Sequence, residues 1–247
     1  MLTRLRNPDA FRSDNVNPIS FKRHRFPPDV IRYAVWLYFR FTMSFRDVEE
    51  LLAERGIEVS YETIRCWTIK FGPQIAANLK ARRPAPSPRW HLDEMVCSVG
   101  GKRMYLWRAV DDEGEILDMA MRPYRDGWTA TKFLANLIIG QPIFPERIVT
   151  DGLKSYVGAV ERLRIGHLHQ QGRLVDNNRA ENSHLPIRRR ERKMQKFKSQ
   201  ESAQRFLTTH ASVYNTFYTQ QHLISRPTLR LFRSAANDAW TEATAAA

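Results

Sequence analysis

A series of strand-like and helix-like segments in the middle of the chain limits the possible folds more than any other part of the sequence. Four segments have the apolar residues and short length of strands, and one has apolar residues at helical spacing. In chain order, the strand, strand, strand, helix and strand patterns cover residues 90–99, 104–110, 116–121, 128–139 and 147–150. The turn sequence Asp112-Glu113-Gly114 joins the second strand to the third and indicates an antiparallel pair. This order predicts a layered α/β domain.

The order of elements resembles the opening of a ribonuclease-H-like domain, an α/β fold in which helices flank a mixed sheet. Two aspartates occupy related places in it, because Asp93 lies within the first strand and Asp151 directly follows the fourth. The resemblance implies that the fourth strand lies beside the first strand and parallel to it. Asp93 and Asp151 would then be neighbours in space, although they are far apart in the sequence.

Residues 176–199 place one carboxylate, that of Glu181, beside a dense basic run. If the segment is a helix, Glu181, His184 and Arg188 stand at i, i+3 and i+7 on one face. Such a face suits a site that holds a metal ion and a phosphate together, whereas the alternative is a solvated basic helix. The predicted DNA contacts in this run are Arg188, Arg189, Arg190, Arg192 and Lys193.

The net charge favours a polyanionic partner. The formal charge is +13 at pH 7, and nucleic acid is the commonest partner of such a basic chain. There is neither an apolar stretch of about 18 residues nor an amphipathic anchor, which argues against a membrane. Residues 1–25 lack a signal-peptide pattern, and Cys66 and Cys97 stand alone. We therefore expect a cytoplasmic, nucleoid-associated protein.

The N-terminal third predicts three helices after a flexible basic arm. Ser44 and Ser60 are suitable caps for the second and third helices, and Gly72-Pro73 is expected to end the third. The last two helices, joined by a tight turn at Gly56, form a helix-turn-helix pattern. The alternative is a small helical packing domain with no role in DNA binding. The side chains predicted to face a major groove are those of Tyr61, Arg65, Thr68 and Lys70.

The predicted domain boundaries follow changes in composition. Residues 80–89 hold three prolines and no periodicity, which indicates an extended, stiff linker. Residues 237–247 are rich in alanine and are predicted to fray. The predicted parts are a basic arm at 1–26, a helix-turn-helix domain at 27–79, the linker, a catalytic domain at 90–220 and a C-terminal tail at 221–247.

Four motifs in a fixed order carry a more specific resemblance. They are Trp-His-Leu-Asp-Glu at 90–94, Leu-Trp-Arg-Ala-Val-Asp at 106–111, Thr-Asp-Gly-Leu-Lys-Ser-Tyr at 150–156, and Asn-Asn-Arg-Ala-Glu-Asn-Ser-His at 177–184, which Arg-Arg-Arg-Glu-Arg follows. Together they resemble the DDE transposases of bacterial insertion sequences, closest to the IS6-type family, over residues 20–220. The resemblance implies a catalytic triad of Asp93, Asp151 and Glu181, with Arg188 as the basic residue of the family signature.

One departure from the family lies between the second and third members of the implied triad. The interval from Asp151 to Glu181 is shorter than is usual in the family. The shortening falls in residues 164–176, which we interpret as a surface connection that tolerates deletion.

Three carboxylates provide an all-oxygen ligand set that suits Mg²⁺ or Mn²⁺. Two such ions about 4 Å apart can activate a water or a 3′-hydroxyl and stabilise the leaving oxygen of a phosphodiester. The resemblance implies that the helix-turn-helix binds terminal inverted repeats and that the catalytic domain cuts 3′ ends and joins them to target DNA. It also implies at least a homodimer. The alternatives are a metal-dependent nuclease that does not join DNA and a DNA-binding regulator without catalysis.

Other polar and aromatic residues near these motifs have simpler interpretations. Glu94 points to the strand face opposite Asp93, which favours a structural role. His184 could contact DNA or orient the carboxylate of Glu181, and the sequence does not separate the two. The tryptophans are interpreted as core residues in preference to base-stacking ones, and they are Trp90, Trp107 and Trp128.

Overall fold

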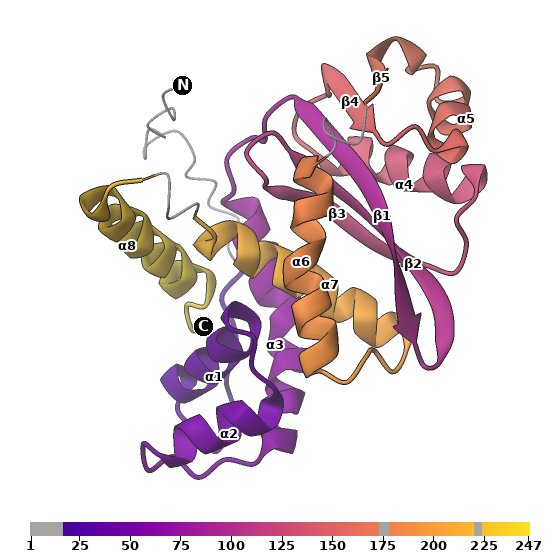
Figure 1. The fold of residues 1–247 in the computed structure, drawn as a ribbon. Coiled ribbons are helices and arrows are strands. Elements are labelled where there is room, and N and C mark those ends of the chain that lie inside the picture. The colour runs from indigo at the N-terminus through magenta and orange to yellow at the C-terminus, as the bar shows by residue number, and fades with distance from the viewer. Residues whose placement is uncertain (1–16, 173–177, 220–223) are drawn as a thin grey trace.

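The computed structural model describes residues 17–172, 178–219 and 224–247, and in the helix that begins at Asn178 it describes side chains from His184 onward. In this part of the chain a mixed sheet has the strand order β3-β2-β1-β4-β5 (Figure 1). The strands are β1 (Arg89–Val99), β2 (Lys102–Asp111), β3 (Ile116–Arg122), β4 (Arg147–Thr150) and β5 (His169–Gln171). The first three strands pair antiparallel, while β4 is parallel to both β1 and β5. The predicted mixed sheet is therefore confirmed.

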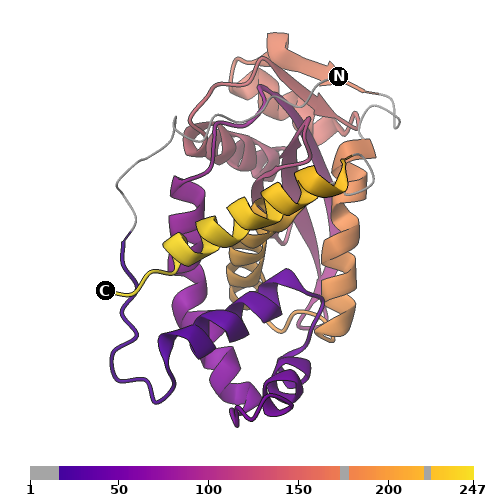
Figure 2. The same cartoon turned by 90° about the vertical axis from the view of Figure 1, so that its left-hand side faces the viewer.

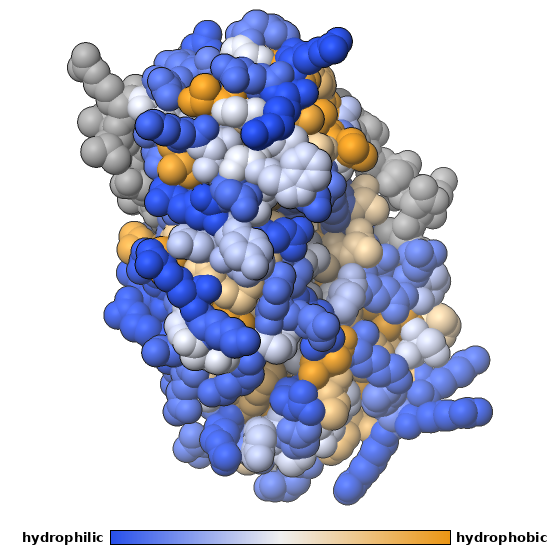
Figure 3. Space-filling model, turned by 90° about the vertical axis from the view of Figure 1, so that its right-hand side faces the viewer, coloured by the Kyte–Doolittle hydropathy of each residue, from blue (hydrophilic) through white to orange (hydrophobic). Residues whose placement is uncertain are grey.

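Helices cover both faces of the sheet. On one face, α4 (Gly127–Gly140) and α5 (Lys154–Arg162) bury apolar side chains against Leu92 and Trp107 of the strands. On the other face, α6 (Asn178–Lys193) and α7 (Gln200–Phe217) pack near Met95 and Leu106. Figure 3 views the side of the molecule that carries α4 and α5, where hydrophilic side chains predominate and small apolar groups lie among them.

Alternation along β1 decides which side chains reach which layer. Leu92 belongs to the core under α4 and α5, and Met95 belongs to the core under α6 and α7. Because successive strand residues point to opposite faces, Asp93 faces the α6 layer and Glu94 faces the α4 and α5 layer.

The N-terminal region forms three helices, α1 (Pro28–Arg40), α2 (Phe45–Ala53) and α3 (Tyr61–Ala81). The predicted caps of the last two helices form. Ser44 makes a capping box with Asp47, and the Ser60 hydroxyl accepts a hydrogen bond from the Thr63 backbone N–H at 3.3 Å. The helix-turn-helix assignment stays a prediction.

The prediction that the third helix ends at Gly72-Pro73 is wrong, since α3 continues to Ala81. Its second half is buried along α7, and this packing outweighs the backbone hydrogen bond lost at Pro73. Gly72 allows the close approach, because a Cβ there would lie 3.1 Å from the Thr209 hydroxyl oxygen.

The helices of the N-terminal region share one apolar core with the sheet. The cluster contains Ile31 and Phe39 of α1 together with Leu106 of β2 and Phe206 of α7. Residues 82–88 are also attached to the body, because the Arg83 guanidinium donates to the Ile116 carbonyl at 2.8 Å. The predicted division into separate domains stays a prediction.

The C-terminal segment is a helix, α8 (Arg226–Ala243), so the prediction of a frayed alanine-rich end is wrong for residues 237–243. Alanine favours helix, and here the helix is also anchored. Trp240 and Ala243 are buried, and the Asn78 side-chain amide donates to the Ala243 carbonyl at 2.8 Å. Figures 1 and 2 show α8 beside the helices of the N-terminal region. Within the described ranges, no helix combines the length and hydrophobicity needed to span a bilayer.

Candidate active site

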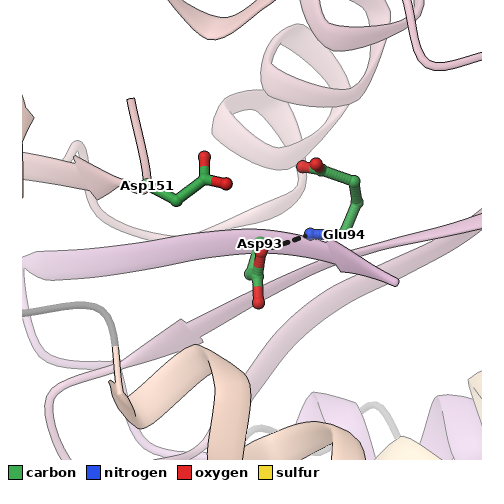
Figure 4. Close-up of side chains that lie close together, drawn as sticks. All are labelled: Asp93, Glu94 and Asp151. Carbon is green, nitrogen blue, oxygen red and sulfur yellow. Dashed lines mark hydrogen bonds between the residues drawn. The ribbon is translucent and has the colours of Figure 1, made fainter. Parts of the chain in front are cut away.

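The parallel pairing of β1 with β4 brings two of the predicted catalytic residues together. Leu92 is in register with Thr150, so the next residues, Asp93 within β1 and Asp151 directly after β4, lie side by side. One carboxylate oxygen from each of Asp93, Glu94 and Asp151 lies within 4.8 Å of the other two. We call these three residues the acidic cluster. Figure 4 shows Glu94 and Asp151 on one side of β1 and Asp93 on the other.

Asp93 is held by two donors. Its Oδ1 accepts a hydrogen bond from the Glu94 backbone N–H at 2.9 Å, and its Oδ2 lies 3.0 Å from Nε2 of His184. Both side chains are buried. His184 therefore orients a carboxylate, as one of the two interpretations expected, but the carboxylate is that of Asp93. It also fixes α6 against β1.

A buried cation lies on the same face of the sheet as Asp93. Arg108 of β2 is directly opposite Asp93 in the antiparallel register and is fully buried. Burial lowers the pKa of its guanidinium to about 10, which still leaves it protonated near neutral pH. Cross-strand partners share a face, so this guanidinium lies on the same side of β1 as the Asp93 side chain. The signal that could have revealed it was an arginine within an apolar strand.

Asp151 is placed by the way the chain leaves β4. Gly152 has a φ of +86°, a left-handed conformation that glycine adopts without strain, and it turns the chain sharply into α5. Asp151 Oδ1 accepts a hydrogen bond from the Leu153 backbone N–H at 3.1 Å. The side chain is half-buried at the carboxyl end of the parallel strand. Asp151 therefore presents a carboxylate at the sheet edge next to Asp93.

Glu94, which was predicted to have a structural role, has its carboxylate beside those of Asp93 and Asp151. Its carboxylate pairs with Arg125, whose Nε lies 2.6 Å from Oε1. Burial raises the pKa of Glu94 to about 7, although Arg125 opposes the rise, and the neighbouring Asp151 adds to it. Glu94 therefore belongs to the acidic cluster geometrically, on the side away from His184.

The third predicted catalytic residue is Glu181. The backbone of α6 includes position 181, but the side chain of Glu181 lies outside the described residues. The next turn of the helix carries His184, which contacts Asp93.

The predicted DNA contacts divide into exposed and buried side chains. Of the predicted contacts on α6, those exposed to solvent are Arg188, Arg189, Arg192 and Lys193, although Lys193 Nζ pairs with Asp47 at 2.7 Å. On α3, Tyr61 and Lys70 are exposed and Arg65 is half-buried and paired with Glu62. Thr68 is buried, and its hydroxyl donates to the Arg65 carbonyl at 2.8 Å. Thr68 is therefore not available to a DNA groove.

Arg190 also departs from its predicted role. Its side chain is 2% exposed, and its guanidinium donates to the backbone carbonyls of Tyr38, Phe41 and Met43. The same group lies 4.7 Å from the centre of the Tyr38 ring. The prediction that Arg190 contacts DNA therefore does not hold, because the guanidinium is used to join α6 to α1 and to the connection after it.

The strand order and the acidic cluster at the parallel β1–β4 pair fit the class of ribonuclease-H-like domains with a carboxylate site. Comparison with known protein families identifies the family within that class. Residues 87–220 match the model of the DDE_Tnp_IS240 family, described as a DDE domain. The chain belongs to this family of DDE transposases of insertion sequences.

Curated relatives agree with this family. The transposase for insertion sequence-like element IS431mec of Staphylococcus aureus is 36% identical over 133 residues, which cover 53% of this chain and 58% of the relative. The transposase for insertion sequence element IS257 in transposon Tn4003, also from S. aureus, is 35% identical over the same length. An uncharacterized Yersinia pseudotuberculosis protein, pYV0051, is 36% identical over 76 residues, 30% of this chain and 71% of that protein. The match thus spans little more than half the length of the S. aureus transposases.

Proposed function

We propose that this chain is the transposase of an insertion sequence, which cuts DNA at the 3′ ends of the element and joins those ends to target DNA. The observation that carries the proposal is the pair Asp93 and Asp151, adjacent at the parallel β1–β4 strands of a domain that matches the DDE family.

The chemistry of the donor set fits a divalent cation. The acidic cluster offers only carboxylate oxygens, which are the ligands that Mg²⁺ and Mn²⁺ prefer. We assign the cation ligands to Asp93, Asp151 and Glu181, with two ions as the expected number. When bound, such cations supply Lewis acidity that lowers the pKa of a water or a 3′-hydroxyl and neutralises charge on a phosphodiester.

The chain itself supplies orientation and charge. His184 and the Glu94 backbone N–H hold both oxygens of Asp93, and the Leu153 N–H holds one oxygen of Asp151. These contacts fix the carboxylates before substrate binds, which reduces the reorganisation that the reaction would otherwise require. We assign phosphate contacts to exposed arginines on the solvent side of α6, namely Arg188, Arg189 and Arg192.

We propose that α3 reads the terminal inverted repeats and that two chains act together as at least a homodimer on two DNA ends. We also propose a cytoplasmic, nucleoid-associated location. The exposed face of α3 carries Tyr61 and Lys70, and the basic chain has a formal charge of +13, which supports a DNA groove as its partner.

The two cysteines provide a test of the α3 assignment. Cys66 is exposed on α3, whereas Cys97 is buried, and burial raises the pKa of the Cys97 thiol to about 12. A thiol reagent at pH 8 should therefore modify Cys66 first, because the thiolate is the reactive form. Saturating inverted-repeat DNA should slow that reaction at least about tenfold if α3 occupies a groove.

The control for this experiment is the Cys97→Ser variant, in which the whole rapid signal comes from Cys66. Unrelated duplex DNA at equal concentration should protect Cys66 much less. An unchanged Cys66 rate with the inverted-repeat DNA bound would exclude α3 as the groove-binding helix.

The proposed reaction is tested with DNA ends that are already cut. Wild-type protein with Mg²⁺ or Mn²⁺ should join precut inverted-repeat ends to a plasmid, and gel electrophoresis detects the joined product. Uncut ends should first be cleaved and then joined. Cleavage without joining would replace the proposal with a nuclease, and binding without either reaction would replace it with a DNA-binding regulator.

A further inference from the structure

We propose that the exposed rings of Tyr124 and Trp128, here called the aromatic platform, bind an unpaired base of the DNA strand that enters the acidic cluster. This inference rests on the proposed function and names the form of its substrate. The DNA would be locally unpaired beside the point of cleavage.

The exposure of these rings is the first observation. Trp90 and Trp107 are 0% exposed and belong to the core, as predicted, but Trp128 is 62% exposed and Tyr124 is 66% exposed. The expectation that Trp128 is a core residue is therefore wrong. Trp128 follows the N-cap Asp126 at the start of α4, where the helix has not yet turned its apolar face to the sheet. Both rings are exposed on the segment that leads into α4, Tyr124 in the loop and Trp128 in the first turn of the helix.

The loop that carries the platform is fixed by hydrogen bonds. The Trp107 indole N–H donates to the Tyr124 carbonyl at 3.4 Å, and Asp126 accepts from the Thr129 backbone N–H at 2.7 Å. Arg162 of α5 donates to the Gly127 carbonyl at 3.2 Å. The rings are therefore presented by an ordered backbone, and binding a base would require little further ordering of the loop.

The same loop reaches the acidic cluster. Arg125 lies between the two rings in sequence and pairs with Glu94, while the Ser155 hydroxyl donates to the Arg125 carbonyl at 3.5 Å. The Cα atoms of Arg125 and Trp128 are at most about 11 Å apart, so Trp128 lies on the same short segment that meets Glu94. Helical side chains tilt toward the N-terminus, and Trp128 stands in the first turn of α4. Its ring therefore lies at the end of α4 nearest Glu94.

Charge around the platform favours a nucleic acid strand. Lys132 Nζ lies 5.2 Å from the centre of the Trp128 ring, a cation–π contact that places a positive charge beside the ring. A base can stack only when its face is free, which the interior of a duplex does not offer. Aromatic stacking with nearby cations is how proteins bind single strands without reading their sequence.

The test compares two DNA probes of equal length that share one strand, a fully paired duplex and a fork with unpaired ends. Fluorescence anisotropy gives the Kd of each, at one salt concentration and without divalent cations so that the DNA stays intact. Wild-type protein should bind the fork more tightly than the duplex. Trp128→Ala should weaken fork binding about 5- to 150-fold, the equivalent of about 1–3 kcal/mol for one stacked base. Its duplex affinity should stay within about twofold.

Two further variants make the result specific. Trp128→Phe keeps an aromatic ring and should retain most of the preference for the fork. Ile139→Ala removes another exposed apolar side chain from the last turn of α4 and should change neither affinity. Melting temperatures within about 2 °C of the wild type would show that the surface variants remain folded.

Several outcomes overturn the platform. Equal fork binding by Trp128→Ala and wild type would do so, as would an equal loss on fork and duplex. A wild-type protein that cleaves and joins DNA but shows no preference for the fork would remove the platform and leave the proposed function intact. A wild-type protein that neither binds nor cuts any probe would remove both.

Discussion

Asp93→Asn and Asp151→Asn should each abolish cleavage and strand transfer, with rates at least about 10³-fold below wild type. An amide preserves the size of the side chain but lacks the negative charge that holds a divalent cation. Affinity for uncut inverted-repeat DNA should stay within about threefold, because binding comes mainly from phosphate contacts elsewhere. Cleavage gels measure the rates, and anisotropy measures the affinity of the same protein preparations.

A graded series of variants sharpens this prediction. His184→Ala should lower the rate by about 10- to 100-fold, because removing a partner that orients a metal ligand typically costs that much. Glu181→Gln tests the third predicted ligand in the same assay. Asp238→Asn makes the identical chemical change on exposed α8 and should be silent. Full activity in Asp93→Asn or Asp151→Asn would remove that residue from the catalytic set.

The parts of the fold that could be predicted are those in which local pattern and tertiary environment agree. The apolar segment predicted at residues 90–99 becomes β1 (Arg89–Val99), and the turn at Asp112-Glu113-Gly114 joins β2 to β3. The parallel position of β4 is not encoded locally, because it depends on a crossover through α4. That prediction came from the resemblance, and with it came the proximity of Asp93 and Asp151.

The missed features depend on which side of an element faces a neighbour. A run of arginines gives no direct sign of which one is buried. The apolar spacing does give one, since the buried Ile187 and Arg190 stand at i and i+3 on one stripe of α6, and the partly buried Met194 follows directly after the helix. Pro73 predicted the end of a helix because the sequence does not show that α7 packs along the second half of α3. Glu94 lay beside a predicted ligand, but its partner Arg125 comes from a loop far along the chain.

Arg190→Ala should destabilise the protein by about 3–5 kcal/mol, the cost of removing one partner from a buried charged network. Its guanidinium joins α6 to three backbone carbonyls of α1 and the connection after it, and it lies over the rings of Tyr38 and Phe206. Burial lowers the pKa of Arg190 to about 10, so the side chain is still charged at neutral pH. Urea denaturation and thermal melting followed by circular dichroism measure the loss, which corresponds to about 6–20 °C in Tm.

The adjacent Arg189 supplies a matched control, because it is exposed on the same turn of α6. Arg189→Ala removes an identical charge and should change the free energy of unfolding by no more than about 0.5 kcal/mol. The two variants should also differ in DNA binding. Arg189→Ala should weaken DNA affinity, by a larger factor at lower salt concentration, while the protein remains fully folded. Equal melting temperatures for the two variants would show that Arg190 does not tie α6 to the N-terminal helices. Arg190→Ala should have a lower melting temperature but bind DNA with wild-type affinity below that temperature. That result would show that Arg190 holds α6 in place while the neighbouring arginines contact the phosphates.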